Sequence, residues 1–228
     1  MEKKLMLAPS MGCCDLFDFE NQVRYIDAHA DFLHIDIKDG NYVKTFGVGP
    51  DFMAILKQLV TPPMDAHLMV KHPQDYIEAC AKAGAEYITP HTDCIESDAF
   101  VTLNKIISLG CKAGIALNPA APLEGIRHYL PLLSKVTIMI VDAGYAGQKV
   151  IPQMYDKIRM LAQWRKEMGL DFLIEADGSM NAGVYAPLYE AGADMVVLGP
   201  PALWNKDRDI QKAWAIMERE VEVELSGK

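Results

Sequence analysis

The sequence lacks the features that mark secreted, disulfide-bonded or membrane proteins. It has only five cysteines, an odd number without CxxC spacing, so we expect reduced thiols rather than a disulfide framework. Long hydrophobic runs are missing, and the apolar part of the opening MEKKLMLAPSMG is too short for a signal peptide or a membrane span. We therefore expect a cytoplasmic protein with no membrane partner.

Positive charge is also scarce. The chain has 22 Lys and Arg residues against 31 Asp and Glu, giving a net charge of −9. Because the sequence has no basic stripe, we do not expect nucleic acid as a partner.

No linker, low-complexity tract or charge block interrupts the 228 residues, half of which are apolar. This length and composition suit one large core, so we expect a single domain over residues 1–228.

Short apolar runs alternate with longer amphipathic ones along the whole chain. The expected strands are KLMLAPS, FLHIDIK, MDAHLMV, YITPH, CKAGIALN, KVTIMIVD, DFLIEADG and MVVLGP. The clearest helical patterns cover residues 153–168 and 209–225. Four segments, AKAGAEYI, SLGCKAGI, EMGLDFLI and YEAGADMVV, place glycine where a helix would end just before a strand.

Eight strand–helix units in a chain of this length predict a single (β/α)8 TIM barrel. The alternative is a doubly wound sheet, which usually has a glycine-rich turn after its first strand. Here the first strand runs into PSMGCCD, which is not such a turn. The barrel is the preferred fold class.

Ionisable residues recur near the expected strand ends. His34, Asp36 and Lys38 alternate along FLHIDIK, so their side chains share one strand face, where burial for packing alone would be costly. Catalytic groups of TIM barrels gather at the carboxyl ends of the strands, where His67 and Asp177 also fall. Two imidazoles with two carboxylates favour one divalent ion, Zn, Fe, Mn or Co rather than calcium.

Five segments resemble the signature segments of the ribulose-phosphate 3-epimerase family, in family order. They are APSMGCCDL, HIDIKDG, DAHLMV, VDAGYAGQ and EADGS. Within that family, LAQWRKEMGLDFLIEADGSMN and ALWNKDRDIQKAWAIM look most like D-allulose-6-phosphate 3-epimerases. The resemblance implies a TIM barrel, a homo-oligomer and an isomerase that inverts carbon 3 of a ketose phosphate.

The resemblance also implies roles for particular residues. Asp36 and Asp177 match the two catalytic aspartates, which exchange protons at carbon 3 through a cis-enediolate. The same two aspartates, with His34 and His67, match the metal ligands. The residues matching substrate contacts or phosphate-binding turns are Ser10, His67, Gly144, Tyr145, Ala146, Gly147, Gln148, Gly178, Ser179, Met180 and Gly199.

Several positions are expected to modify the site. Lys38 stands where the family usually has a methionine of the apolar cap over the reacting carbons, whereas Met69 and Met139 match the other two cap residues. Strand alternation turns Asp65 and Glu175 inward, where each would fix a ligand imidazole or join a salt bridge in the barrel. Pro200 and Pro201 replace residues that bind phosphate, and proline offers no backbone N–H.

The resulting expectation is a metal-dependent 3-epimerase for D-allulose 6-phosphate and D-fructose 6-phosphate. Ribulose 5-phosphate is the alternative substrate, followed by a ketose whose phosphate end differs. A non-catalytic sugar-phosphate-binding barrel would not need two opposed carboxylates. An aldolase would need a Schiff-base lysine inside the barrel, and Lys38 is the only inward candidate that the sequence analysis identifies.

Overall fold

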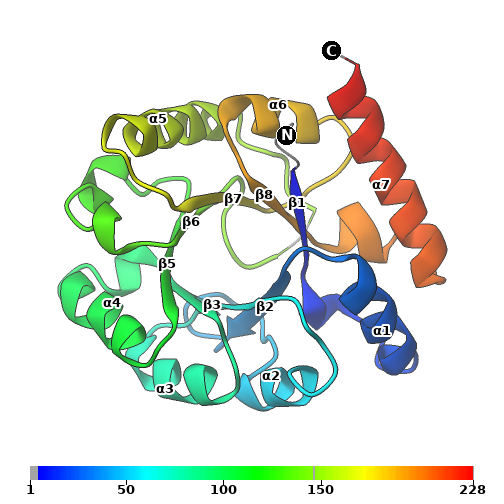
Figure 1. The fold of residues 1–228 in the computed structure, drawn as a ribbon, viewed down its shortest axis with the longest axis horizontal. Helices are drawn as coiled ribbons and strands as arrows, with labels where there is room; N and C mark the ends of the chain where they lie inside the picture. The colour runs from blue at the N-terminus through cyan, green and yellow to red at the C-terminus, as the bar shows by residue number, and fades with distance from the viewer. Residues whose placement is uncertain (1–4, 146, 228) are drawn as a thin grey trace.

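A computed structural model describes residues 5–145 and 147–227, and its eight parallel strands form a nearly closed barrel. The strands lie inside a ring of helices (Figure 1). The strands are β1 (Met6–Pro9), β2 (Leu33–Lys38), β3 (Met64–Met69), β4 (Tyr87–Pro90), β5 (Lys112–Leu117), β6 (Lys135–Met139), β7 (Leu173–Asp177) and β8 (Met195–Leu198). The predicted TIM barrel is confirmed, and each predicted strand segment contains one of these strands.

Each strand from β2 to β8 pairs with its sequence neighbour, and β8 pairs with β1. Between β1 and β2 the ladder is reduced to a single parallel bridge, Ser10 with His34. All strands point the same way, so their carboxyl ends meet at one mouth of the barrel. Residues distant in sequence are thereby brought to one place.

The α-helices are α1 (Phe19–His29), α2 (Pro50–Leu56), α3 (Gln74–Lys82), α4 (Ala99–Ser108), α5 (Gln153–Glu167), α6 (Tyr185–Ala191) and α7 (Ile210–Ser226). The expected alternation fails between β5 and β6, where two 3-10 turns, Leu123–Ile126 and Leu130–Leu132, replace an α-helix. Pro119, Pro122 and Pro131 lie in this connection, and proline cannot donate the hydrogen bonds that a continuous helix requires.

The four predicted helix-ending glycines adopt the left-handed backbone that this role requires. Gly84, Gly110, Gly169 and Gly192 have φ angles of +94°, +81°, +62° and +108°. Each follows a helix and precedes the next strand, so the chain reverses within a few residues. These glycines give the repeated helix-to-strand turns their shape.

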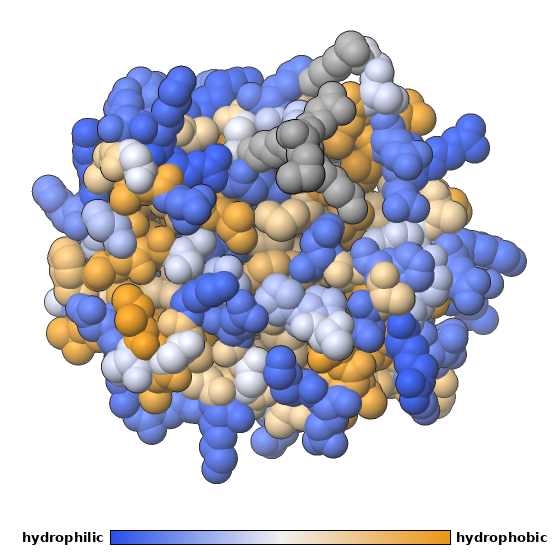
Figure 2. Space-filling model, viewed as in Figure 1, coloured by the Kyte–Doolittle hydropathy of each residue, from blue (hydrophilic) through white to orange (hydrophobic). Residues whose placement is uncertain are grey.

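The core lies between the strands and the helices, where apolar side chains from every strand are buried. Hydrophilic side chains project around the outline of the molecule, over the ring of helices (Figure 2). Within the described chain, no helix combines the length and apolar character needed to cross a bilayer. The barrel interior differs from the core, because it encloses buried ionisable groups from several strands.

Candidate active site

Two histidines and two aspartates converge at the mouth of the barrel. His34 and Asp36 come from β2, His67 from β3 and Asp177 from β7. Nε2 of His34 lies 3.1 Å from Nδ1 of His67 and 3.3 Å from Oδ1 of Asp36. Oδ2 of Asp177 lies 3.8 Å and 3.5 Å from the same two nitrogens. All four predicted metal ligands are thus brought together.

The spacing of these atoms fits a divalent ion. Ligand atoms about 2.1 Å from a tetrahedral ion lie about 3.4 Å from one another. The measured separations of 3.1–3.8 Å bracket that value. Two imidazole nitrogens and two carboxylate oxygens are also a donor set that zinc, iron, cobalt and manganese accept. The cluster is therefore a candidate metal centre for an ion of these kinds.

His67 is oriented by a third histidine on the next strand. Its Nε2 lies 2.9 Å from Nε2 of His91, and the two rings stack with centroids 5.0 Å apart. Burial, with the neighbouring His67 ring as a smaller cause, holds the pKa of His91 well below its ordinary value, which favours a neutral His91. A neutral His91 accepting from Nε2–H of His67 leaves the Nδ1 lone pair of His67 facing the cluster.

A layer of charged residues lies beneath the cluster, fully buried in the barrel. Nζ of Lys135 on β6 lies 2.5 Å from Oδ2 of Asp65 and 2.6 Å from Oε1 of Glu175. Nδ1 of His34 lies 3.3 Å from the same oxygen of Asp65 and 3.7 Å from that of Glu175. The inward orientation predicted for both carboxylates is confirmed, and each contacts both Lys135 and the imidazole of His34.

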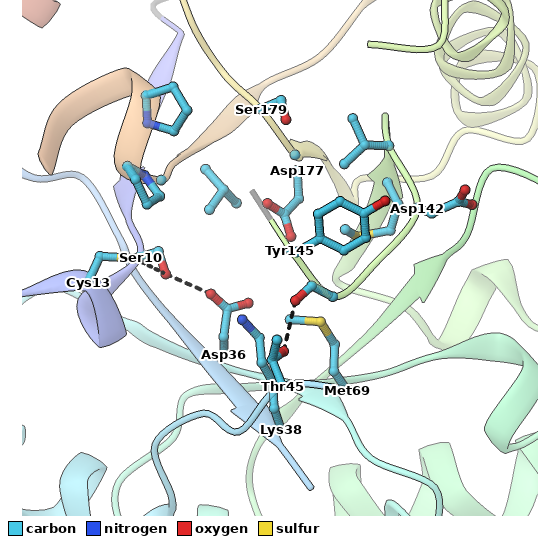
Figure 3. A pocket seen from close by; sticks show the side chains of 18 residues that line it. Ser10, Cys13, Asp36, Lys38, Thr45, Met69, Asp142, Tyr145, Asp177 and Ser179 are labelled. Atoms are coloured by element: carbon cyan, nitrogen blue, oxygen red, sulfur yellow. Dashed lines mark hydrogen bonds between the residues drawn. The ribbon is translucent and has the colours of Figure 1, made fainter. Parts of the chain in front are cut away.

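A pocket of about 330 Å³ opens above the cluster. Asp36 and Asp177 reach its floor, and Lys38 extends along one wall toward them (Figure 3). Met69 and Met139 line it as the predicted apolar cap residues. The wall also contains Ser10, Cys13, Thr45, Val141, Asp142, Gly144, Tyr145, Gly178, Ser179, Val197, Gly199, Pro200 and Pro201. The pocket therefore joins carboxylates, apolar side chains and glycine-rich turns in one cavity.

Residues 6–203 match the Ribulose-phosphate 3 epimerase family. The chain is 37% identical to the ribulose-phosphate 3-epimerase of Synechocystis sp., over 87% of either chain. It is 34% identical to that of Bacillus subtilis, over 90% of this chain and 94% of the relative, and 36% identical to that of Escherichia coli K12, over 86% and 88%.

The chain belongs to the ribulose-phosphate 3-epimerase family. It is thus an epimerase of the isomerase class, as the resemblance of its five segments implied. The family is metal-dependent, and the cluster of two histidines and two aspartates is the candidate centre for that ion here. A mutant tryptophan synthase alpha-subunit from Pyrococcus furiosus shares the fold alone, with a TM-score of 0.68 at 16% identity, covering 99% of this chain and 100% of its own.

The two aspartates of this family member differ in their electrostatics. Burial acts to raise the pKa of Asp36, but His34, His67 and the charge of Lys38 outweigh it and hold the pKa well below its ordinary value. Burial raises the pKa of Asp177, and the negative charge of Asp36 adds to this effect against the opposing charge of His34. Before any ion binds, Asp36 is therefore the more readily ionised carboxyl.

Hydrogen bonds fix the pocket's polar groups. Ser10 donates from Oγ to Oδ2 of Asp36 at 2.6 Å, which leaves Oδ1 of Asp36 facing the histidines (Figure 3). Thr45 donates to the carbonyl oxygen of Gly144 at 2.8 Å and ties the loop after β2 to the loop after β6. Ser179 has a positive φ of 48°, and its buried Oγ has no hydrogen-bond partner in the described chain.

Some predicted substrate contacts do not reach the pocket wall. The side chain of Gln148 donates to the backbone carbonyls of Asp142 and Tyr145, so it stabilises the loop to which it belongs. His67 is enclosed at the metal cluster, and the side chain of Met180 is buried in the core. Gly147 is exposed with a φ of +85° and lies outside the pocket lining. Ala146 lies outside the described residues.

Lys135 is a second inward lysine beside Lys38, which was the only inward candidate identified from the sequence. Alternation along KVTIMIVD could have found it, because Lys135 and Met139 are four residues apart and Met139 faces the pocket. Lys135 does not support the aldolase alternative. Its ammonium group is fully buried between two carboxylates, so a substrate carbonyl cannot reach it. Cys13, Val141 and Val197 are further pocket residues that the sequence analysis did not identify.

Proposed function

We propose that this protein interconverts D-ribulose 5-phosphate and D-xylulose 5-phosphate with the aid of a divalent ion. The observation that carries the proposal is the pair Asp36 and Asp177, which face one pocket from two strands beside the paired histidines. The names of the curated relatives favour this five-carbon substrate pair over the D-allulose 6-phosphate first expected.

His34, Asp36, His67 and Asp177 would hold the ion. When bound, a divalent cation would supply positive charge that stabilises developing negative charge on the oxygens at carbons 2 and 3 of the ketose. The neutral His91 and the buried Asp65 orient the two imidazoles so that each presents a lone pair to the ion.

Epimerisation requires removal of the carbon-3 proton on one face and delivery of a proton on the other. Asp36 would act as the base for one epimer, and Asp177 would deliver a proton to the opposite face. In the reverse direction the two carboxyls exchange roles. Ser10, donating to Oδ2 of Asp36, fixes the orientation of that carboxylate.

The pocket walls suggest how the substrate lies. Met69 and Met139 would cover the reacting carbons, where an apolar surface strengthens the charge interactions of the carboxylates by excluding water. The phosphate would lie at the opposite side, near the turn of Gly178 and Ser179. The unpartnered Oγ of Ser179 and the amides of that turn are its expected donors.

D-allulose 6-phosphate remains the second candidate substrate, because LAQWRKEMGLDFLIEADGSMN and ALWNKDRDIQKAWAIM look most like enzymes for that sugar. Pro200 and Pro201 line the phosphate side of the pocket, and they would allow a ketose with a different far end.

The test is to incubate the purified, metal-loaded protein with D-ribulose 5-phosphate and with D-allulose 6-phosphate in deuterated water. We expect epimerisation with deuterium at carbon 3, and a higher kcat/KM for the pentulose. A higher kcat/KM for the hexulose would reverse the substrate assignment. Tight binding of both sugars without turnover or exchange would instead identify a sugar-phosphate-binding barrel.

A further inference from the structure

Lys135 occupies an unusual place for a lysine, at the base of the barrel interior with no exposed surface. Its ammonium group reaches across the barrel from β6 to Asp65 on β3, and it also contacts Glu175 on the adjacent strand β7. Burial opposes a charged lysine, but the two carboxylates outweigh this and raise its pKa, so Lys135 carries a positive charge. Lys135 therefore links β6 to β3, a strand that does not pair with β6.

Both carboxylates are also held by threonines. Thr89 donates to Oδ1 of Asp65 at 2.6 Å, and Thr137 donates to Oε1 of Glu175 at 2.7 Å. Glycine at position 114 makes the first of these bonds possible, since a Cβ there would come within 2.3 Å of the Thr89 hydroxyl. The two carboxylates that Lys135 contacts are thus each held by a threonine as well, from β4 for Asp65 and from β6 for Glu175.

The fixed oxygens face His34, a residue of the metal cluster. Nδ1 of His34 lies 3.3 Å from the Asp65 oxygen that Lys135 contacts, and within the described chain this buried nitrogen makes no hydrogen bond. If Nε2 of His34 gives its lone pair to an ion, Nδ1 must carry the proton, and the Asp65 carboxylate is its nearest acceptor.

His34, Asp65 and Glu175 also form a second group with metal-ligand spacing. The ammonium of Lys135 lies 2.5 and 2.6 Å from oxygens of its two carboxylates, where a cation would sit. This second group is therefore filled by the protein's own lysine.

We propose that Lys135 is a positioning residue for the metal centre: it holds Asp65 and Glu175 against His34 and so fixes the ring that presents Nε2 to the ion. The inference rests on the proposed metal-dependent function. A brace needed only for folding would be replaceable by apolar residues, since buried ion pairs contribute little net stability compared with well-packed hydrophobic groups.

The central experiment compares two variants with the unaltered protein. Lys135→Met removes the charge but leaves two buried carboxylates uncompensated, so it is expected to destabilise the fold. Lys135→Met combined with Glu175→Gln keeps the formal charge of the buried layer, leaves the Asp65 carboxylate beside His34, and is the variant for measurement. Lys112→Met is the control, because Lys112 on β5 forms an exposed pair with Glu86 at 2.8 Å.

The readouts are the affinity for Co²⁺ and Zn²⁺ against a competing chelator, and the visible absorption of the Co²⁺ form. We expect the double variant to remain folded and to bind each ion about 10- to 100-fold more weakly, a usual effect of losing a partner of a ligand histidine. Its Co²⁺ spectrum should change and its kcat should fall more than its KM rises, while Lys112→Met should match the unaltered protein.

Unchanged metal affinity and an unchanged Co²⁺ spectrum in the double variant would overturn the role of Lys135 alone. Failure of the unaltered protein to bind any divalent ion would overturn the proposed function as well. A measurement without variants is also decisive: imidazole ¹⁵N shifts of the zinc-loaded protein should report His34 protonated at Nδ1. Protonation at Nε2 would contradict the inference.

Discussion

Oδ1 of Asp36 and Oδ2 of Asp177 approach the same nitrogen, Nδ1 of His67, at 3.3 and 3.5 Å. The two aspartates come from β2 and β7, and both also reach the floor of the pocket. The two carboxyls therefore belong to the candidate metal centre and to the pocket at the same time.

Replacing either aspartate by asparagine should abolish epimerisation, because one face of the substrate then lacks its acid or base. Loss of one such group typically lowers the rate about 10²–10⁴-fold. In Asp177→Asn, Asp36 should still exchange the carbon-3 proton of one epimer with solvent deuterium, and the other epimer should not exchange. Asp156→Asn is the control, since this carboxylate is exposed on α5, lies outside the pocket lining and should leave the rate unchanged. Exchange of both epimers by both variants would contradict the two-carboxyl mechanism.

Removal of divalent ions by a chelator should abolish activity, and one ion per chain should restore it.

The affinity for the ion should fall as the pH falls. Burial acts to lower the pKa of His34, but Asp36 and Glu175 outweigh it and hold the pKa well above its ordinary value. A proton therefore competes with the ion for His34 up to a higher pH than for an ordinary histidine. Metal titrations at several pH values check this, and a pH-independent affinity would exclude His34 as a ligand.

Lys38→Met should shift the pH profile of the reaction. The positive charge of Lys38 helps to lower the pKa of Asp36, so its removal should raise that pKa. The acidic limb of kcat/KM should accordingly move to higher pH, because Asp36 must be ionised to act as the base. Lys44→Met serves as the comparison, since Lys44 is exposed and lies outside the pocket lining. An identical shift in both variants would mean that the effect is a general one of net charge.

Pro200 and Pro201 should weaken phosphate binding. Neither has a backbone N–H, and the next two amides, of Ala202 and Leu203, already donate to the carbonyl of Gly199. Each hydrogen bond regained is worth roughly 0.5–1.5 kcal/mol, or about two- to twelve-fold in affinity. Changing both prolines to Thr-Ser should therefore lower KM for a ketose phosphate while KM for the unphosphorylated ketose stays the same. A KM that does not change would show that the prolines cost no binding energy.

The sequence by itself determined the barrel and most of its site. A strand places alternate side chains on opposite faces, so His34 with Asp36, and Glu175 with Asp177, could be assigned to the inward face without coordinates. Glycine's tolerance of a positive φ likewise predicted the four helix-to-strand turns, since that preference belongs to the residue itself. The helix expected between β5 and β6 does not form, because the prolines of that connection cannot donate the hydrogen bonds of a continuous helix.

Only the tertiary structure decided which inward side chains meet. Lys135 is separated from Asp65 by 70 residues and from Glu175 by 40, and their contact depends on the width of the barrel and the length of the lysine side chain. The orientation of Gln148 was likewise decided by the tertiary structure, because its side-chain amide donates to carbonyls of its own loop rather than lining the pocket. Local periodicity fixes the face on which a residue lies, whereas distances across the barrel follow from how all eight strands close around one another.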